Sequence, residues 1–254
     1  MRCEVMGIVN VTPDSFSDGG KYFTPEEAVR RVRNLVADGA DIIDLGAEST
    51  RPGATPLTAE EEWSRLAPVF ERLNLKGTVP SRASSLLSSL LSLISVDTYH
   101  PETARRALAA GAGMINCVYP EPVEEMFKLC AEYGAKLVFP AKSLGTVPDD
   151  LMGTVPSFID PMIGFGTTRE EDIELLRSIP ELAKKGKVLV GASRKRIVKK
   201  LTGEKMTGKN LGGNLAIAVY AAMNGASAVR VHDVKETVQA LRVVEALRSV
   251  GGAA

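Results

Sequence analysis

The chain has 254 residues, of which 44% are hydrophobic and 24% are charged, and this is enough to build one sizeable core. Its 31 lysines and arginines balance its 31 aspartates and glutamates, so the overall charge favours neither a nucleic acid nor a membrane surface as a partner. The three cysteines, at positions 3, 117 and 130, form no CxxC pair, and neither a signal peptide nor a membrane span is recognisable. We therefore expect a single domain over residues 1–254, located in the cytoplasm.

Short apolar runs alternate with amphipathic stretches along most of the chain. Strands are predicted near residues 3–11, 40–47, 93–98, 114–118, 136–141, 157–162, 187–192 and 227–232. Helices are predicted near residues 25–38, 58–74, 101–110, 121–133, 170–185, 210–224 and 235–249. This alternation predicts an α/β fold, the parallel (β/α)8 or TIM barrel, whose functional groups lie at the carboxyl ends of the strands.

Two segments do not fit a regular barrel. Residues 142–156 contain glycine and proline interruptions and no helical period, so the fifth crossover helix is predicted to be missing or shortened. We expect this flank of the barrel to be its least stable side, because each parallel strand needs cover on its outer face. Residues 74–93 include Pro80 and a serine–leucine run, which is compatible with either an extra helix or a poorly ordered insertion.

The stretch from Met6 to Gly20, MGIVNVTPDSFSDGG, combines a buried strand with a polar loop. An apolar run that ends in turn residues is typical of a parallel strand covered on both faces. Asn10 lies near the end of this strand, where an α/β barrel places its ligands.

Polar residues also stand at the ends of four other predicted strands, namely Asp97, Asn116, Asp160 and Lys195. A single aspartate after a strand is usually a helix cap. Four such groups converging in one pocket cost several kcal/mol to bury unless a polar ligand satisfies them. Carboxylates, an amide and an ammonium together suit a flat heterocycle with a guanidine-like edge.

Six ordered stretches resemble the successive signatures of dihydropteroate synthases, the pterin-binding enzymes of folate synthesis. They are residues 6–20, 48–53, 94–98, 160–166, 193–195 and 230–234. The resemblance implies a transferase that condenses 6-hydroxymethyl-7,8-dihydropterin diphosphate with 4-aminobenzoate and releases pyrophosphate. Pyrophosphate leaves readily only when its developing charge is neutralised by cations or Mg²⁺.

The resemblance also implies roles for individual residues. The pterin ring is expected to bind Asp97, Asn116, Asp160 and Lys195, and the diphosphate is expected to bind Asn10, Thr50, Arg51, Arg230 and His232. Mg²⁺ is expected beside Asn10, and the aminobenzoate beside Phe16, Pro52 and Ser193. The catalytic residues are expected to be Asp14, Asp18, Lys195, Arg230 and His232. The resemblance further suggests a homodimer.

Several positions depart from the family pattern. The family's Gly-Phe-Gly-Lys is here Gly-Phe-Gly followed by Thr167, and its Asn-Asp is here Asn116 followed by Cys117. Strand five ends Phe-Pro-Ala-Lys in place of Met-His-Met, and the arginine usual near Asn210 is absent.

These departures leave two alternatives open, a methyltetrahydrofolate-binding methyltransferase and a catalytically impaired pterin-binding barrel. The motifs Ser193-Arg194-Lys195 and Arg230-Val231-His232 favour the synthase. His100, which precedes Pro101, is expected at the surface.

Overall fold

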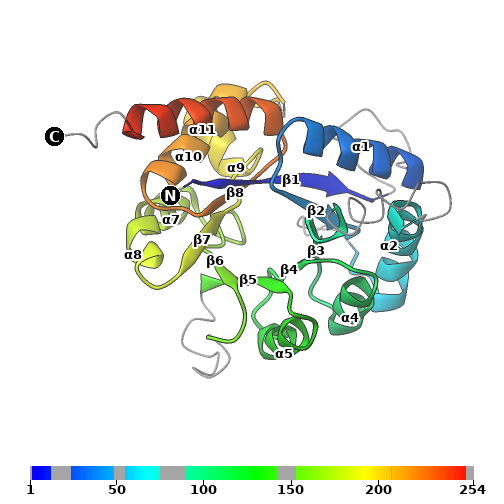
Figure 1. Ribbon diagram of the computed structural model, residues 1–254. Coiled ribbons are helices and arrows are strands. Elements are labelled where there is room, and N and C mark those ends of the chain that lie inside the picture. The colour runs from blue at the N-terminus through cyan, green and yellow to red at the C-terminus, as the bar shows by residue number, and fades with distance from the viewer. Residues whose placement is uncertain are drawn as a thin grey trace.

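The computed structural model describes residues 2–12, 24–48, 55–74, 90–141, 153–206 and 208–249. Eight parallel strands close into a barrel in chain order, from β1 beside β2 to β8 beside β1, with helices outside the ring (Figure 1). The strands are β1 (Glu4–Asn10), β2 (Ile42–Gly46), β3 (Ile94–Asp97), β4 (Met114–Asn116), β5 (Lys136–Pro140), β6 (Ser157–Asp160), β7 (Lys187–Val190) and β8 (Ala228–Val231). The predicted TIM barrel is confirmed.

The helices follow the strands around the outside of the barrel. They are α1 (Pro25–Ala37), α2 (Ala59–Asn74), α4 (Pro101–Ala109), α5 (Val123–Tyr133), α7 (Arg169–Arg177), α8 (Ile179–Ala183), α9 (Arg196–Thr202), α10 (Leu211–Met223) and α11 (Val234–Ser249). Local sequence fixes where several of them begin. At the start of α1, for example, the Thr24 side chain accepts from the Glu27 amide while the Glu27 carboxylate accepts from the Thr24 amide, which is a capping box.

One predicted helix is divided in the structure, and one observed helix was not predicted. The helix expected over residues 170–185 is divided at Ser178, which ends α7 and precedes α8. Pro180 lies at the start of α8, and proline lacks the amide proton that a continuous helix would need there. The short helix α9 was not among the predicted ranges. The expectations for residues 75–89 and 142–152 lie outside the described residues.

The barrel is closed at its amino end by apolar side chains. Seven buried side chains from seven strands pack together inside it: Met6, Ile42, Met114, Val138, Phe158, Leu189 and Ala228. A second, larger apolar core lies between the strands and the surrounding helices. The inner cluster forms a floor, so polar groups placed above it open only toward the carboxyl ends of the strands.

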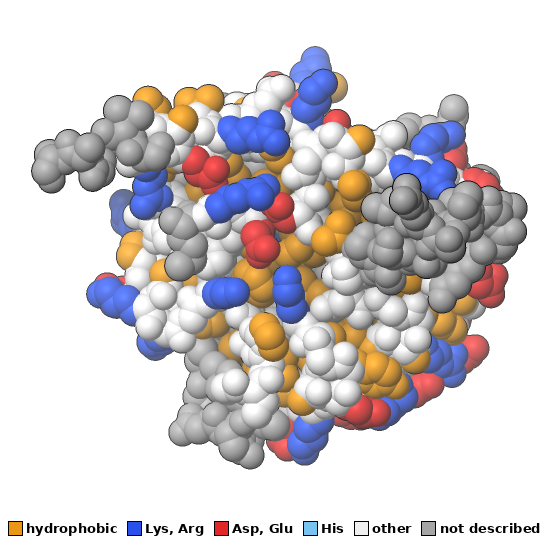
Figure 2. Space-filling view, in the orientation of Figure 1, with side chains coloured by type: hydrophobic (Ala, Val, Ile, Leu, Met, Phe, Trp, Pro, Cys, Tyr) orange, Lys and Arg blue, Asp and Glu red, His pale blue; other side chains and the backbone are white. Residues whose placement is uncertain are grey.

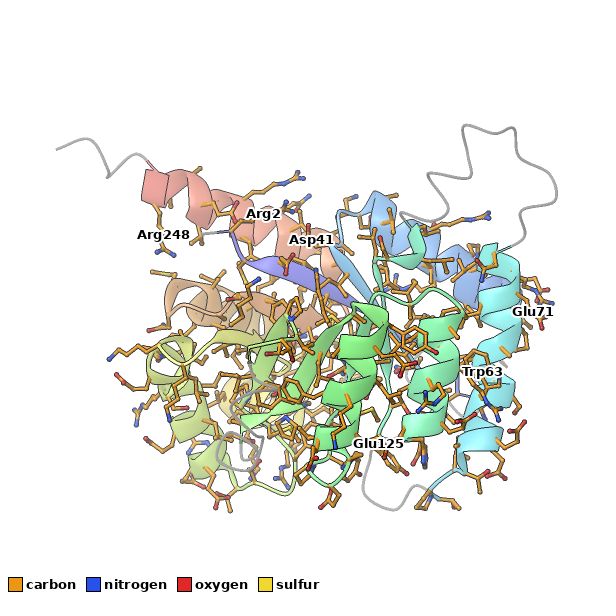
Figure 3. All side chains as sticks on the ribbon, turned by 60° about the horizontal axis from the view of Figure 1, so that its bottom comes forward. Arg2, Asp41, Trp63, Glu71, Glu125 and Arg248 are labelled. Carbon is orange, nitrogen blue, oxygen red and sulfur yellow. The ribbon has the colours of Figure 1, made fainter. Side chains whose placement is uncertain are left out.

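An ion pair ties the start of β1 to the start of β2. A guanidinium nitrogen of Arg2 lies 2.8 Å from a carboxylate oxygen of Asp41, and the two side chains lie side by side in Figure 3. The other Asp41 oxygen accepts from the Val5 amide at 2.9 Å. Within the described part of the chain, no helix is both long and apolar enough to cross a membrane.

Candidate functional site

A layer of polar side chains lies directly above the apolar floor. Side chains on one strand alternate between its two faces, so the residue two positions after a floor residue points into the same interior. Two positions after Ile42, Met114, Phe158 and Ala228 stand Asp44, Asn116, Asp160 and Arg230. The strand period therefore delivers two carboxylates, an amide and a guanidinium to one level of the barrel.

Arg230 joins three strands through two carboxylates. Its Nε donates to Asp44 Oδ2 at 2.6 Å, and its Nη2 donates to Asp97 Oδ2 at 2.6 Å. The Asn116 amide also donates to Asp44 Oδ2, at 3.1 Å. Asp44 is fully buried, and a buried carboxylate is tolerable only beside a cation or several donors. Arg230 thus provides part of the charge neutralisation and hydrogen bonding that the sequence predicts a ligand to supply.

Two acceptors in this layer remain unused. Asp44 Oδ1 and Asn116 Oδ1 are buried and have no hydrogen-bond partner among the described residues. An unpaired buried acceptor costs about 1–3 kcal/mol. The barrel interior is therefore prepared for a ligand that carries N–H donors.

Burial raises the pKa of two of the site's carboxylates, Asp97 and Asp160. Burial raises the pKa of Asp97 to about 7, against the opposing charge of Arg230 and together with that of Asp44. Burial also raises the pKa of Asp160, and the Lys195 ammonium opposes this. Asp97 can consequently accept or release a proton near neutral pH, and strongly perturbed carboxylates of this kind cluster at functional sites.

Lys195 lies beside β6 and the loop that follows it. Its Nζ donates to the Ile163 carbonyl at 2.7 Å and lies 4.3 Å from the centre of the Phe165 ring. Burial lowers the pKa of Lys195 to about 8, and the Asp160 carboxylate opposes this. Asp160 accepts from the Met162 amide at 2.7 Å, which fixes one of its oxygens at the start of the loop.

His232 follows β8 and faces Ser193. The Ser193 hydroxyl lies 3.1 Å from His232 Nδ1 and also accepts from the His232 amide at 3.3 Å. Since the hydroxyl oxygen accepts from the amide, its own proton is free to be donated to Nδ1. In the tautomer in which Ser193 donates to Nδ1, the ring proton lies on Nε2. Burial, followed by the charge of Arg194, lowers the pKa of His232 to about 3, so the ring is neutral at ordinary pH.

The segment between Ser193 and α9 is held by a second polar group. The Arg194 guanidinium lies 2.6 Å from Asp233 Oδ1, and the Arg194 amide donates to Asn214 Oδ1 at 2.9 Å. Arg194 has a positive φ of 59°, which is uncommon for a residue other than glycine. These bonds keep the Ser193–Lys195 backbone in a conformation that sends Ser193 toward His232 and Lys195 toward Asp160.

His100 is not at the surface, contrary to the expectation from its sequence. Its side chain is only 20% exposed, its Nε2 lies 3.5 Å from Glu48 Oε2, and its ring stacks against Tyr99 at 4.2 Å. The Tyr99 hydroxyl donates to Glu48 Oε1 at 2.7 Å. The histidine is covered because the chain after β3 folds over the carboxylate that follows β2.

The structure places the predicted residues unevenly. Asp97, Asn116, Asp160, Lys195 and Arg230 lie in one connected polar layer, and Asn10 ends β1 opposite Gly46. Arg230, predicted to bind the diphosphate, is paired with Asp97 of the predicted pterin set and with Asp44. The predicted residues Asp14, Phe16, Asp18, Thr50, Arg51 and Pro52 lie outside the described residues.

Asp44 is the site residue that the sequence argument missed. The signal was present, since a carboxylate two positions after Ile42 occupies an inward position of a fully buried strand. A charged side chain at such a position needs a partner inside the barrel.

Asn10, beside which Mg²⁺ is predicted, ends β1. Within the described ranges, no group of three or more His, Cys, Asp or Glu side chains could hold a metal ion. Mg²⁺ usually binds one or two protein oxygens and completes its shell with phosphate oxygens and water. The amide oxygen of Asn10, at the mouth of the barrel, fits a Mg²⁺ ion that arrives with a phosphorylated substrate.

Comparisons with known proteins agree with this geometry. The family model described as "Pterin binding enzyme" matches residues 6–148 and 153–232. A dihydropteroate synthase of Streptococcus pyogenes serotype M6 is 37% identical over 96% of this chain and 95% of its own length.

Solved structures give the same result. The Xanthomonas albilineans dihydropteroate synthase with 4-aminobenzoic acid has a TM-score of 0.84 and 38% identity, over 98% of this chain and 94% of that one. A structure of the same enzyme in complex with 7,8-dihydropteroate has a TM-score of 0.79 and 36% identity, over 97% and 94% of the two chains.

Proposed function

The chain belongs to the family of pterin-binding enzymes and is a transferase of the dihydropteroate synthase type, and we propose how its residues perform that reaction. The amine of 4-aminobenzoate attacks the methylene carbon of 6-hydroxymethyl-7,8-dihydropterin diphosphate. A carbon–nitrogen bond forms, the bond from that carbon to the diphosphate oxygen breaks, and the amine loses a proton. The products are dihydropteroate and pyrophosphate.

The observation that carries this proposal is the layer of buried acceptors above the apolar floor. Asp44 Oδ1 and Asn116 Oδ1 lack hydrogen-bond partners among the described residues, Asp97 pairs with Asn116 on the neighbouring strand, and Asp160 is buried at the end of β6. A pterin edge presents several N–H donors in one plane, which matches acceptors arranged around a barrel mouth. The Lys195 ammonium supplies the donor that a ring carbonyl or nitrogen needs.

The diphosphate lies farther out in this proposal, near the ends of β1 and β8. His232 is neutral, and in the tautomer with its proton on Nε2 it donates a hydrogen bond to a phosphate oxygen without adding charge. Asn10 would hold Mg²⁺, which neutralises charge on the departing pyrophosphate. Ser193 fixes the His232 ring and thereby connects the diphosphate end to the segment that carries Lys195.

We further propose that the protein is a homodimer. Helices α10 and α11 expose large apolar side chains, with Met223 59%, Val243 60% and Leu247 73% exposed. Figure 2 shows hydrophobic side chains at the surface in the region that these helices occupy in Figure 1. A second copy of the chain would cover them, and light scattering of the purified protein tests this.

Location in the cytoplasm is part of the same proposal. Cys3, Cys117 and Cys130 are buried free thiols, and burial raises the pKa of each. Free thiols of this kind suit a reducing compartment.

Product analysis tests the reaction. The purified chain is incubated with the pterin diphosphate, 4-aminobenzoate and Mg²⁺, and dihydropteroate and pyrophosphate are measured together. Equal amounts of the two products are expected. Methyl transfer from methyltetrahydrofolate to a corrinoid protein, or pterin binding without either product, would replace the proposal with one of the two alternatives.

A further inference from the structure

A buried carboxylate binds the loop between β6 and α7 through hydrogen bonds. Asp172, in the first turn of α7, is fully buried. Its Oδ1 accepts from the Gly164 amide at 2.7 Å and from the Thr167 hydroxyl. The Thr167 oxygen also accepts from the Gly164 amide, at 3.1 Å, so the amide is shared between two acceptors. A hydrogen bond to a carboxylate is stronger than one between neutral groups.

The same peptide group also binds Lys195. The Ile163 carbonyl, which accepts from Lys195 Nζ at 2.7 Å, belongs to the peptide whose N–H is donated to Asp172. A peptide group is planar, and in the trans form its N–H and C=O point in opposite directions. The hydrogen bond from the Gly164 N–H to Asp172 therefore fixes the direction of the Ile163 carbonyl. This direction in turn fixes where the Lys195 ammonium binds.

The packing around this peptide leaves little freedom. Gly164 has a φ of 79°, and a Cβ at this position would lie 3.0 Å from Lys195 Cδ, so the lysine stem passes directly over it. The Phe165 ring lies below the ammonium. The Lys195 side chain thus contacts the Ile163 carbonyl, the Gly164 backbone and the Phe165 ring of this loop.

We propose that Asp172 is a positioning residue that aims the Lys195 ammonium at the pterin through the Ile163–Gly164 peptide. The inference rests on the proposed function, in which Lys195 contacts the pterin. Asp172 itself touches no substrate, and Thr167 adds a hydroxyl that orients its carboxylate.

A double-mutant cycle tests the coupling between the two side chains. Calorimetry with 6-hydroxymethylpterin is applied to wild type, Asp172→Ala, Lys195→Met and the double variant. Asp172→Ala should weaken binding about tenfold, the worth of one charge-assisted hydrogen bond. In the Lys195→Met background the same change should weaken binding less than about twofold, because the group that Asp172 positions is gone. An equal effect in both backgrounds would overturn the proposal.

Two variants distinguish positioning from general destabilisation. Asp172→Asn keeps an oxygen that accepts from Gly164 and should restore most of the affinity. Glu170→Gln removes an exposed carboxylate from the same helical turn and should leave binding unchanged. If Asp172→Asn binds as weakly as Asp172→Ala, the acceptor is not what matters and the proposal is wrong.

A measurement on the ligand-free protein keeps the test independent of pterin binding. The carbon NMR signal next to Nζ reports the pKa of Lys195, which is faced by Asp160, Asp97, Arg230 and Asp172. Asp172→Ala should lower this pKa because a carboxylate is lost and the Ile163 carbonyl is no longer held toward the ammonium, whereas Glu170→Gln should not. An unchanged pKa in Asp172→Ala would overturn the inference, whereas a wild type that binds no pterin would overturn only the proposed function.

Discussion

Replacing Arg230 by methionine removes the cation that Asp44 and Asp97 share inside the barrel. The guanidinium makes 2.6 Å contacts with Asp44 and with Asp97, and the side chains of these two residues are 0% and 16% exposed. Removing one partner of a buried ion pair costs about 3–5 kcal/mol, because the remaining charge is left unpaired. Two carboxylates lose their cation here, so we expect a loss in the upper half of that range for the free energy of unfolding.

The dependence of this loss on pH follows from Asp97. Its folded pKa of about 7 lies above its unfolded value of about 3.9, so the folded state binds more protons between these values. The stability that Asp97 contributes is fully present below its unfolded pKa and is lost as the pH rises through its folded pKa. Removing Arg230 takes away the charge that lowers the pKa of Asp97. The cost of Arg230→Met should therefore be larger at pH 8 than at pH 5.5.

Urea unfolding at both pH values measures this effect, with two reference variants. Arg2→Met breaks the exposed pair with Asp41, whose side chains are 63% and 21% exposed, and should cost about 0–1 kcal/mol. The double variant Arg230→Met with Asp44→Asn should recover about 1–2 kcal/mol relative to Arg230→Met, because a neutral amide is easier to bury than a carboxylate. A cost of Arg230→Met no greater than that of Arg2→Met, or one independent of pH, would refute the reasoning.

Four further outcomes are expected at the site. His232, with a pKa of about 3, should show no movement of its ring NMR signals between pH 5 and 8, and a midpoint near 6.5 would contradict its burial. Its stabilising contribution should be lost only as the pH falls from the unfolded value toward 3. Above pH 7, where Asp97 is increasingly ionised, affinity for 6-hydroxymethylpterin should decline through pH 8 as Lys195 loses its proton; an affinity that stays level from there to pH 10 would separate Lys195 from the pterin. Asp160→Asn should cost at least about 2 kcal/mol in pterin binding by calorimetry, and equal affinity would remove it from the site. His232→Gln should weaken pyrophosphate binding alone, whereas Arg230→Met should weaken pyrophosphate and pterin binding together. If both variants changed the two affinities in the same way, the separate roles assigned to His232 and Arg230 would be wrong.

The sequence was sufficient for the fold because each strand and helix is specified locally. Thr24 and Glu27 mark the start of α1 without any tertiary contact, and buried strands such as Ile42–Gly46 are continuous apolar runs broken only by one carboxylate. Strand endings are also local, so the positions of Asp97, Asn116 and Asp160 could be predicted. That these side chains point into the barrel follows from the alternation of side chains along each strand.

The partners of these residues could not be predicted, because they depend on the register of a closed sheet. Ile8 of β1 pairs with Asp44 of β2, and Met6 of β1 pairs with Arg230 of β8. This stagger brings Arg230 within reach of Asp44, 186 positions away in the chain. Without the register, the sequence assigns Arg230 to the diphosphate and to catalysis and does not reveal its carboxylate partners. His100 was misplaced for a similar reason, since its cover comes from Glu48.

Thr167 stands where the family pattern has a lysine, and the structure shows how the site is built without that positive charge. The family pattern has a lysine at this position, and a chain without it could have lost part of its pterin side. The structure instead uses the Thr167 hydroxyl to bond the buried Asp172 carboxylate, which in turn holds the peptide that seats Lys195. The ammonium that faces Asp160 is thus provided by β7 and the segment after it, and the loop after β6 supplies its support. Turnover in this chain should accordingly depend on Asp172 more than on any positive charge at position 167.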